Sequence, residues 1–214
     1  MKIYLYLYNE GVELKLKGLK DFLVRNFGNI SVRVISLPKE VVITKGILFD
    51  PLHTQKAFLA LGYKQTGDSC HIVLTKRLFA TFGEDERLHI RASVYSYPSV
   101  ISTSGIVEGP AKPKEYYLYK EKYMRLGVWA LMEKEVKEKF RGSFIDYQDS
   151  RLNEVLKGYI SQALFFYITG KPFCDKKGCR LYNAHWQKDL IYSQIKSGKF
   201  CTAHAKVLYR INPP

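Results

Sequence analysis

The chain has 214 residues, of which 46% are hydrophobic and 25% charged, and its formal net charge is +14. This length and balance predict a globular protein that buries a full core, and they argue against a disordered chain. No stretch approaches 18 uninterrupted apolar residues, and the first residues, MKIYLYLYNEG, lack the pattern of a signal peptide. We therefore expect a cytoplasmic protein with no membrane partner. The positive charge favours contact with nucleic acid or another polyanion, although a solvated basic surface would give the same balance.

The N-terminal region is predicted to form a strand, a helix and a second strand. Apolar and aromatic residues alternate over 2–8, leucines recur at helical spacing over 13–27, and residues 31–37 return to an alternating, β-branched pattern. Gly28 can provide the left-handed residue that ends the helix. Such elements with short connections are typical of a βαβ unit.

Four further elements are expected before the middle of the chain. Residues 41–49 are apolar and β-branched, and predict either a strand or a loop that crosses the core. A helix over 50–61 begins with Asp and Pro, which suit its cap and first turn. Residues 70–76 are almost continuously apolar, as in a central strand covered on both faces. Residues 98–107 begin with a proline, which favours an edge strand.

Residues 87–95 form the clearest half-exposed strand, because apolar residues alternate with Arg87, His89, Arg91 and Ser93. The polar face is predicted to lie toward water or a cleft. There the three cationic side chains could bind an anionic or peptide ligand. A structurally satisfied histidine on a solvated strand would show the same pattern.

The second half of the chain is predicted to be mainly helical. Residues 109–114 (GPAKPK) are the best linker, and 115–140 carry one apolar stripe opposite Glu–Lys pairs, as in a long amphipathic helix. Residues 150–169 include a segment that is apolar all round, which indicates a helix covered on every side. Asp146 and Asp149 precede it and are expected to cap its N-terminus rather than to act as an acid–base pair.

These elements predict one α/β domain over residues 1–214. A mixed sheet of about five strands would be flanked by the long helices. The cysteine-rich segment 174–208 would form a C-terminal module, with one short helix over 188–195.

Three of the four cysteines lie close together in this module, at Cys174, Cys179 and Cys201, and His204 follows them. A C-x4-C pair and a C-x2-H pair, joined by 21 residues, suit one tetrahedral zinc ion. The protein would fill all four positions, so the zinc would be structural rather than catalytic. It would tie the end of the core helix to a C-terminal strand. Buried free thiols beside an incidental histidine are the alternative.

The remaining histidines and cysteine leave other possibilities open. His185 is a rival for the fourth zinc ligand, and Cys70 is expected to be a plain core residue. The smallest separation between two histidines is 18 residues, so no helix can present an H-x-x-x-H pair to a catalytic metal. A metal site gathered from His53, His89, His185 and a distant carboxylate is still possible.

The order of these features resembles the archaemetzincins, a family of zinc metallopeptidases. Their signature is H-E-x-x-H-x-x-G-x-x-H-C-x4-C-x-M, followed by a C-x2-C pair. In this chain Gly170 falls on the family's glycine, the three clustered cysteines fall on three of its four, and His204 replaces the last. The resemblance is strongest over residues 150–208. It implies a metzincin-like fold and a structural zinc.

The catalytic half of the signature does not match. The resemblance places Ala163, Tyr167 and Phe173 at the three zinc-binding histidines. It places Leu164 at the catalytic glutamate and Leu181 at the methionine. None of these side chains is an imidazole or a carboxylate. The resemblance therefore implies a member whose catalytic HExxH motif is lost, with no catalytic residue.

We therefore expect a catalytically inactive, archaemetzincin-like protein that holds one structural Zn²⁺ and binds a protein or peptide. The resemblance places the strand with Arg87, His89 and Arg91 near the substrate cleft. A nucleic-acid-binding protein is one alternative, because the module 174–208 combines basic residues with tyrosines and a tryptophan. A metallopeptidase-like hydrolase with a rebuilt metal site is another.

Overall fold

The computed structural model describes residues 1–7, 16–37, 41, 50–63 and 68–213. The segment expected to be a strand or a crossing loop, 41–49, lies outside these residues except for Val41. Among the helices described, none combines the length and the apolarity that crossing a membrane requires.

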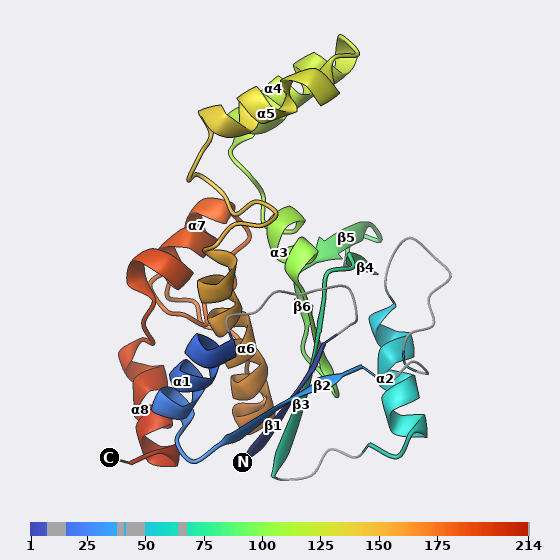
Figure 1. Cartoon of the computed structure of the whole chain (residues 1–214). Coiled ribbons are helices and arrows are strands. Elements are labelled where there is room, and N and C mark those ends of the chain that lie inside the picture. Colours follow the sequence, from blue (N-terminus) through green and yellow to red (C-terminus); the bar gives the residue numbers. More distant parts are fainter. Residues whose placement is uncertain (8–15, 38–40, 42–49, 64–67, 214) are drawn as a thin grey trace.

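A five-stranded mixed sheet in the order β2-β1-β3-β7-β6 forms the centre of the molecule (Figure 1). Its strands are β1 (Lys2–Leu7), β2 (Ser31–Ser36), β3 (Ser69–Thr75), β6 (Ser93–Val94) and β7 (Ser99–Ser102). The first three and β7 are parallel, whereas β6 pairs antiparallel with β7. The predicted mixed sheet of about five strands is thus confirmed, and β6 is one of its edges.

The first three elements form the predicted βαβ unit. Helix α1 (Leu16–Phe27) joins the parallel strands β1 and β2. Gly28 follows the helix in the left-handed region, with a φ of 79°. Helix α2 (Pro51–Ala60) begins as expected at Asp50, whose carboxylate accepts a hydrogen bond of 2.9 Å from the N–H of Leu52.

Helices cover both faces of the sheet (Figure 1). Helices α1, α6 (Leu152–Thr169) and α8 (Thr202–Ile211) lie on one face, and α2 lies on the other. Along β3, Ile72 and Leu74 pack into the cluster that contains α6, whereas Val73 packs into the cluster that contains α2. Because neighbouring residues of a strand point to opposite faces, this central strand is apolar throughout.

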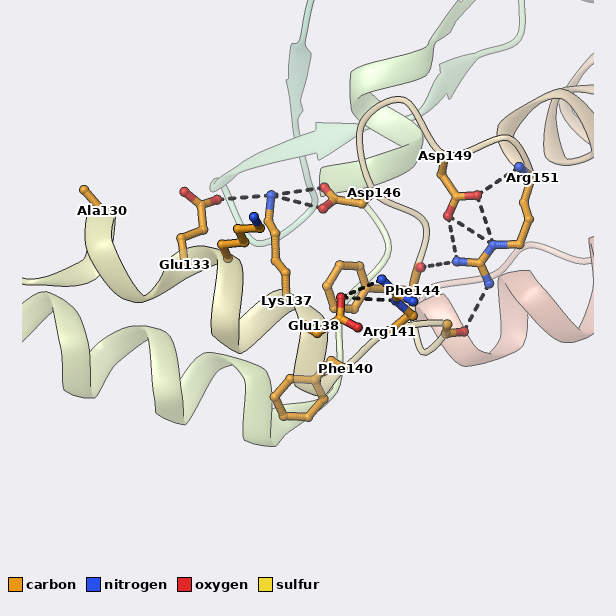
Figure 2. Close-up of a pocket in the computed structure, with 12 residues that line it drawn as sticks. Ala130, Glu133, Lys137, Glu138, Phe140, Arg141, Phe144, Asp146, Asp149 and Arg151 are labelled. Atoms are coloured by element: carbon orange, nitrogen blue, oxygen red, sulfur yellow. Dashed lines mark hydrogen bonds and ion pairs between the residues drawn. The ribbon is translucent and has the colours of Figure 1, made fainter.

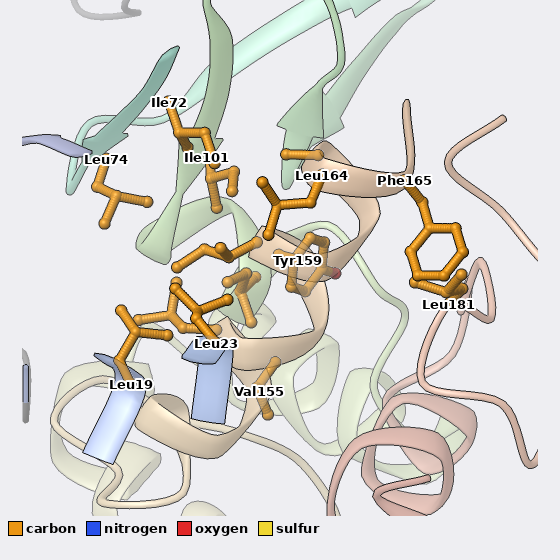
Figure 3. Packing of buried hydrophobic residues seen from close by; sticks show 14 of the residues in the cluster. Leu19, Leu23, Ile72, Leu74, Ile101, Val155, Tyr159, Leu164, Phe165 and Leu181 are labelled. Atoms are coloured by element: carbon orange, nitrogen blue, oxygen red, sulfur yellow. The ribbon is translucent and has the colours of Figure 1, made fainter. Parts of the chain in front are cut away.

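Helix α6 is the core helix. Figure 3 shows Leu23 of α1 and Ile72 of β3 packed around α6 residues such as Val155 and Leu164. Leu164 is fully buried, and truncating such a leucine to alanine typically costs about 2–5 kcal/mol. The helix ends at Thr169, the last residue of the predicted range, and Gly170 follows in the left-handed region with a φ of 72°.

The chain after α6 contains the predicted short helix but not the predicted strand. Helix α7 (Gln187–Ile191) continues into the π-helical segment η2 (Tyr192–Ser197), which ends at Gly198 with a φ of 59°. The final element is the helix α8 rather than a strand. Its residue Leu208 is buried in the core cluster shared with α1 and α6, so the C-terminal apolar residues follow the period of a helix.

The single helix predicted over 115–140 is wrong. Two helices, α4 (Lys114–Arg125) and α5 (Trp129–Lys139), pack side by side as a hairpin that stands out from the sheet (Figure 1). Gly127 has a φ of 70°, and a left-handed residue cannot continue a helix. The hairpin has a small core of its own, formed by Tyr116, Val136 and Phe144.

The edge strand predicted over 98–107 is also wrong. Strand β7 lies inside the sheet, between β3 and β6, and the residues after it form helix α3 (Thr103–Glu108). The hydroxyl of Ser102 starts this helix by accepting a hydrogen bond of 2.8 Å from the N–H of Gly105. The cap at Ser102 therefore begins a helix where the apolar residues of 98–107 had predicted a continuing strand.

The half-exposed strand predicted over 87–95 is divided into two strands. Strand β5 (Leu88–Arg91) leaves the main sheet and pairs with β4 (Phe79–Phe82) in a two-stranded ribbon, and β6 rejoins the sheet. The apolar side chains of β5 are not buried: Leu88 is 59% exposed and Ile90 42% exposed. The alternation predicted the strand, but not the ribbon that leaves these side chains exposed.

Candidate metal centre and cleft

The three clustered cysteines and His204 converge on one point. Their four ligand atoms lie within 4.8 Å of one another. The Sγ atoms of Cys174 and Cys201 are 3.9 Å apart, and the Nδ1 atom of His204 lies 3.6 Å from Cys179 Sγ and 3.1 Å from Cys201 Sγ. Zinc bonds of about 2.3 Å to sulfur and 2.0 Å to nitrogen place tetrahedral ligand atoms roughly 3.5–3.8 Å apart. The donor set and spacing therefore fit a zinc ion.

Local backbone structure explains this convergence. Cys201 is the residue before α8, and His204 lies in the first turn of that helix, so a spacing of three places both side chains at one end. The N–H groups of Lys176 and Cys201 approach Cys174 Sγ and Cys179 Sγ at 3.4 and 3.5 Å. Such N–H donors stabilise thiolates, which are the form that binds metal.

Two of the thiols have opposite electrostatic environments. Burial raises the pKa of the Cys179 thiol to about 12. Burial also raises the pKa of Cys201, but hydrogen bonds from the backbone and ring of His204 outweigh it and bring the pKa to about 6. A bound divalent cation would favour the thiolate form of both residues.

The centre is attached to the core on one side. The ring of His204 packs edge-on against Phe165 of α6, with 5.2 Å between the ring centroids. Phe165 also contacts Phe27 and Phe200. The structure thus attaches the C-terminal module to α6 through a helix, not through the strand that the sequence predicted.

His185 lies away from this centre. It is exposed, and its carbonyl accepts a hydrogen bond of 2.8 Å from the N–H of Ala111. Over the part of the chain that the structure describes, one group of three or more His, Cys, Asp or Glu side chains could hold a metal, and His204 belongs to it. The geometry therefore favours His204 over His185 as the fourth ligand.

A cleft of about 370 Å³ lies between the sheet edge, α6 and the C-terminal module. The edge contributes residues 92–95, α6 contributes Tyr159, Gln162 and Phe166, and the module contributes residues 182–185. Gln162 joins the walls, because its Oε1 accepts from the Tyr95 hydroxyl at 2.6 Å and its Nε2 donates to the Tyr182 carbonyl at 3.1 Å.

The sequence did not indicate Tyr95, Tyr159 and Gln162 as cleft residues, and they line the cleft together with Phe166. The last three are spaced by three and four, which places them on one face of α6. The available signal was Gln162, a polar residue directly before the apolar segment ALFFYIT. It lies on the face of α6 that borders the cleft.

The residues at the catalytic positions of the resemblance are dispersed. Ala163 and Leu164 are buried in the core, and Leu181 is buried beside the metal centre. Tyr167 does not line the cleft, whereas Phe173 does. The face of α6 that borders the cleft thus carries neither an imidazole nor a carboxylate.

Arg87, His89 and Arg91, which were expected to bind a ligand together, do not all line the cleft. Arg91 lines the cleft, and its Nε donates to the Thr81 hydroxyl at 2.9 Å. The His89 Nε2 atom lies 2.7 Å from an Asp85 carboxylate oxygen, and this hydrogen bond lowers the pKa of Asp85. Arg87 is exposed and lies outside the lining.

A larger hollow of about 520 Å³ lies at the base of the helical hairpin, but ion pairs occupy its walls (Figure 2). Lys137 binds both Glu133 and Asp146 at 3.1 Å, and Arg151 binds Asp149 at 2.6 Å. The predicted capping of α6 by these aspartates is wrong, because its first turn has no side-chain cap and Asp149 binds Arg151 instead. The charged side chains of this hollow are paired with one another and are not available to a ligand. The cleft beside α6 is therefore the better candidate site.

The fold and the centre together define a metallopeptidase-like protein. The chain belongs to the Probable metallopeptidase family (DUF6775), whose model matches residues 37–211. No curated protein matches it in sequence. The resemblance drawn from the sequence is thus confirmed for family and fold.

Two crystal structures resemble the whole chain. The archaemetzincin of Methanopyrus kandleri has a TM-score of 0.59 and 12% identity, and the match covers 99% of this chain and 94% of that one. A zinc-dependent peptidase of Methanocorpusculum labreanum (strain Z) has a TM-score of 0.54 and 14% identity, with 98% and 100% covered. At these identities the likeness shows the fold alone.

Proposed function

We propose that this protein binds an extended peptide or protein segment in the cleft without hydrolysing it, and that a structural zinc stabilises one cleft wall. One observation carries the proposal. The cleft lies open beside α6, yet the helix residues that border it are Tyr159, Gln162 and Phe166 rather than metal ligands and a base. The family, the fold and the cleft fit a peptide ligand, whereas these side chains do not supply hydrolytic chemistry.

The cleft is suited to an extended segment. Strand β6 is an edge of the sheet, and edge strands present unpaired backbone groups that can pair with an added strand. The aromatic rings of Phe166 and Phe173 provide apolar surface, and Tyr95 and Gln162 are fixed by their mutual hydrogen bond. Backbone pairing would then supply affinity, and the rings would select side chains.

Zinc bound to the three cysteines and His204 would act as a cross-link with no open position for water. The cleft residues Phe173 and Tyr182 lie next to this cross-link. The N–H of Cys174 donates to the Leu181 carbonyl at 2.9 Å, and the N–H of Tyr182 donates to the Cys179 carbonyl at 2.9 Å. The metal loop and the cleft wall are thus one hydrogen-bonded unit.

Two measurements on the purified protein test the proposal. Metal analysis should give about one zinc per chain, lost when Cys174 and Cys179 are both changed to Ser, and a second zinc would contradict a purely structural metal. A peptide-library binding assay should find ligands, while casein and library digests should show no cleavage. Cleavage that a chelator abolishes would overturn the proposal.

The hydrolase alternative has less support. His53, His89 and His185 do not form a metal-ligand group among the described residues, and His89 is paired with Asp85. The digest with and without chelator separates this alternative from binding alone.

The nucleic-acid alternative rests on the surface of the C-terminal module. Trp186 is 48% exposed, and the Lys188 Nζ lies 5.9 Å from its ring centroid. However, Arg180 is buried against Glu154, and Lys177 is paired with Asp189, so two of the basic residues are already engaged. Oligonucleotide binding at two salt concentrations tests this alternative, because phosphate contacts weaken steeply as salt rises.

A further inference from the structure

The cleft carries positive charge and no negative charge. Its lining includes Arg91 and His185, and no Asp or Glu is among the described residues that line it. The hollow at the hairpin base differs in this respect, since each of its cations but Lys134 has a carboxylate partner there. A ligand that enters the cleft therefore meets the guanidinium of Arg91 without a neighbouring carboxylate in the lining.

Of Arg91 and His185, Arg91 is the better group for binding a carboxylate. It is half-buried on β5, and its Nε donates to the Thr81 hydroxyl on the paired strand β4. It forms no ion pair with any residue that the structure describes. A guanidinium has five N–H donors in a planar fork, so a carboxylate could still be bound by two of them. The Thr81 contact restricts the side chain before the ligand arrives, which lowers the entropic cost of binding.

His185 lies on a different wall of the same cleft. Its position is fixed by two backbone hydrogen bonds of 2.8 Å, from Ala111 to His185 and from Gln187 to Ala111. The apolar rings of Phe166 and Phe173 also line the cleft. The cleft thus combines a guanidinium and an imidazole with aromatic surface.

We propose that the cleft selects an extended segment in which an Asp or Glu side chain lies near an apolar side chain. This inference rests on the proposed function and names the ligand class. Arg91 binds the carboxylate through two parallel, charge-assisted N–H···O hydrogen bonds, that is, in a bidentate contact. His185 contributes a weaker polar contact, and the rings receive the apolar side chain.

Fluorescence anisotropy with short labelled peptides tests the inference. The peptides are capped at both ends and differ only by Glu or Gln beside an apolar residue, so that a free terminus cannot supply the charge. We expect the Glu peptide to bind about tenfold to a hundredfold more tightly than the Gln peptide at low salt. The difference should shrink as salt rises. A parallel Gln peptide with a free C-terminus distinguishes a terminal carboxylate from the acidic side chain, and preference for it over the Glu peptide would overturn the inference.

Arg91→Gln should remove most of the preference for the Glu peptide over the Gln peptide. Arg87→Gln is the matched control, since Arg87 lies four residues away and outside the lining, and it should keep the preference. His185→Gln, at an exposed position, should reduce the preference by less than Arg91→Gln, and it provides a second variant should Arg91→Gln impair folding. Equal binding of the Glu and Gln peptides would overturn this inference while leaving peptide binding intact. Failure of every peptide to bind would overturn the proposed function as well.

Discussion

The metal centre and the cleft share one segment of chain but are built in different ways. The four metal ligands come from 31 consecutive residues, 174–204, and two short spacings bring them together. The cleft is lined by residues from Thr81 to Leu190, which belong to strands, helices and loops. A centre built from local turns follows from sequence spacing, whereas a cleft exists only when distant elements have packed.

Disrupting the metal centre should have the largest effect. Structural zinc contributes on the order of 10–16 kcal/mol in small peptides at neutral pH, so Cys174→Ser combined with Cys179→Ser should unfold the C-terminal module and weaken peptide binding. Thermal melting, zinc content and anisotropy measure the three effects. Asp175→Asn is the control, because Asp175 is exposed in the same loop and is not a ligand. Unchanged peptide affinity in the double variant would show that the centre and the cleft are independent.

Two adjacent phenylalanines on α6 allow the metal centre and the cleft to be perturbed one at a time. Phe165 is 1% exposed beneath His204, whereas Phe166 lines the cleft. Phe165→Ala should cost about 3–5 kcal/mol and weaken zinc binding. Phe166→Ala should cost less stability, keep the zinc and weaken peptide binding. Denaturant unfolding, zinc competition and anisotropy provide the comparison, and the same pattern in both variants would contradict the separation.

Acid should weaken the attachment of the C-terminal module to α6. Burial raises the pKa of Glu154, but hydrogen bonds from Lys157 and Arg180 outweigh it and hold the pKa below its ordinary value of about 4.3. Ionised Glu154 therefore stabilises the folded protein above that pH, and this contribution is lost as pH falls through the lower folded-state pKa. Unfolding free energies of the wild type and Glu154→Gln, measured from neutral pH into this acid range, should converge. A constant difference at all pH values would contradict this origin.

The smallest effect is expected for Tyr95→Phe. The change removes the donor to Gln162 and leaves the amide oxygen without that hydrogen bond, at a cost of about 1 kcal/mol. The zinc content should not change, because Tyr95 does not contact the centre. Denaturant unfolding measures the stability. Loss of zinc in this variant would show that the cleft wall stabilises the metal centre, in addition to the centre stabilising the cleft wall.

The sequence predicted the fold where periodicity and caps acted together. The βαβ unit, the Asp50 cap and the buried helix α6 all follow from local patterns. The errors occurred where one residue or one contact outweighed a pattern. Gly127 divides the helix predicted over 115–140, and the Ser102 cap begins a helix where apolar residues predicted an edge strand.

The sequence by itself indicated the three cysteine ligands, because C-x4-C and C-x2-H are spacings that local turns can bring together, and its resemblance indicated the family. The choice of His204 over His185 came from the structure. Only the tertiary structure separated Arg91 from Arg87 and His89. The three recur at every second residue, but β5 begins after Arg87, and the β4–β5 ribbon places only Arg91 in the cleft lining. The tertiary structure likewise made Gln162 a cleft residue and Ala163 a core residue, because the elements packed around α6 leave the cleft along one face of that helix. Which face is left open depends on elements more than 60 residues away in sequence, such as Tyr95, and no local pattern records it.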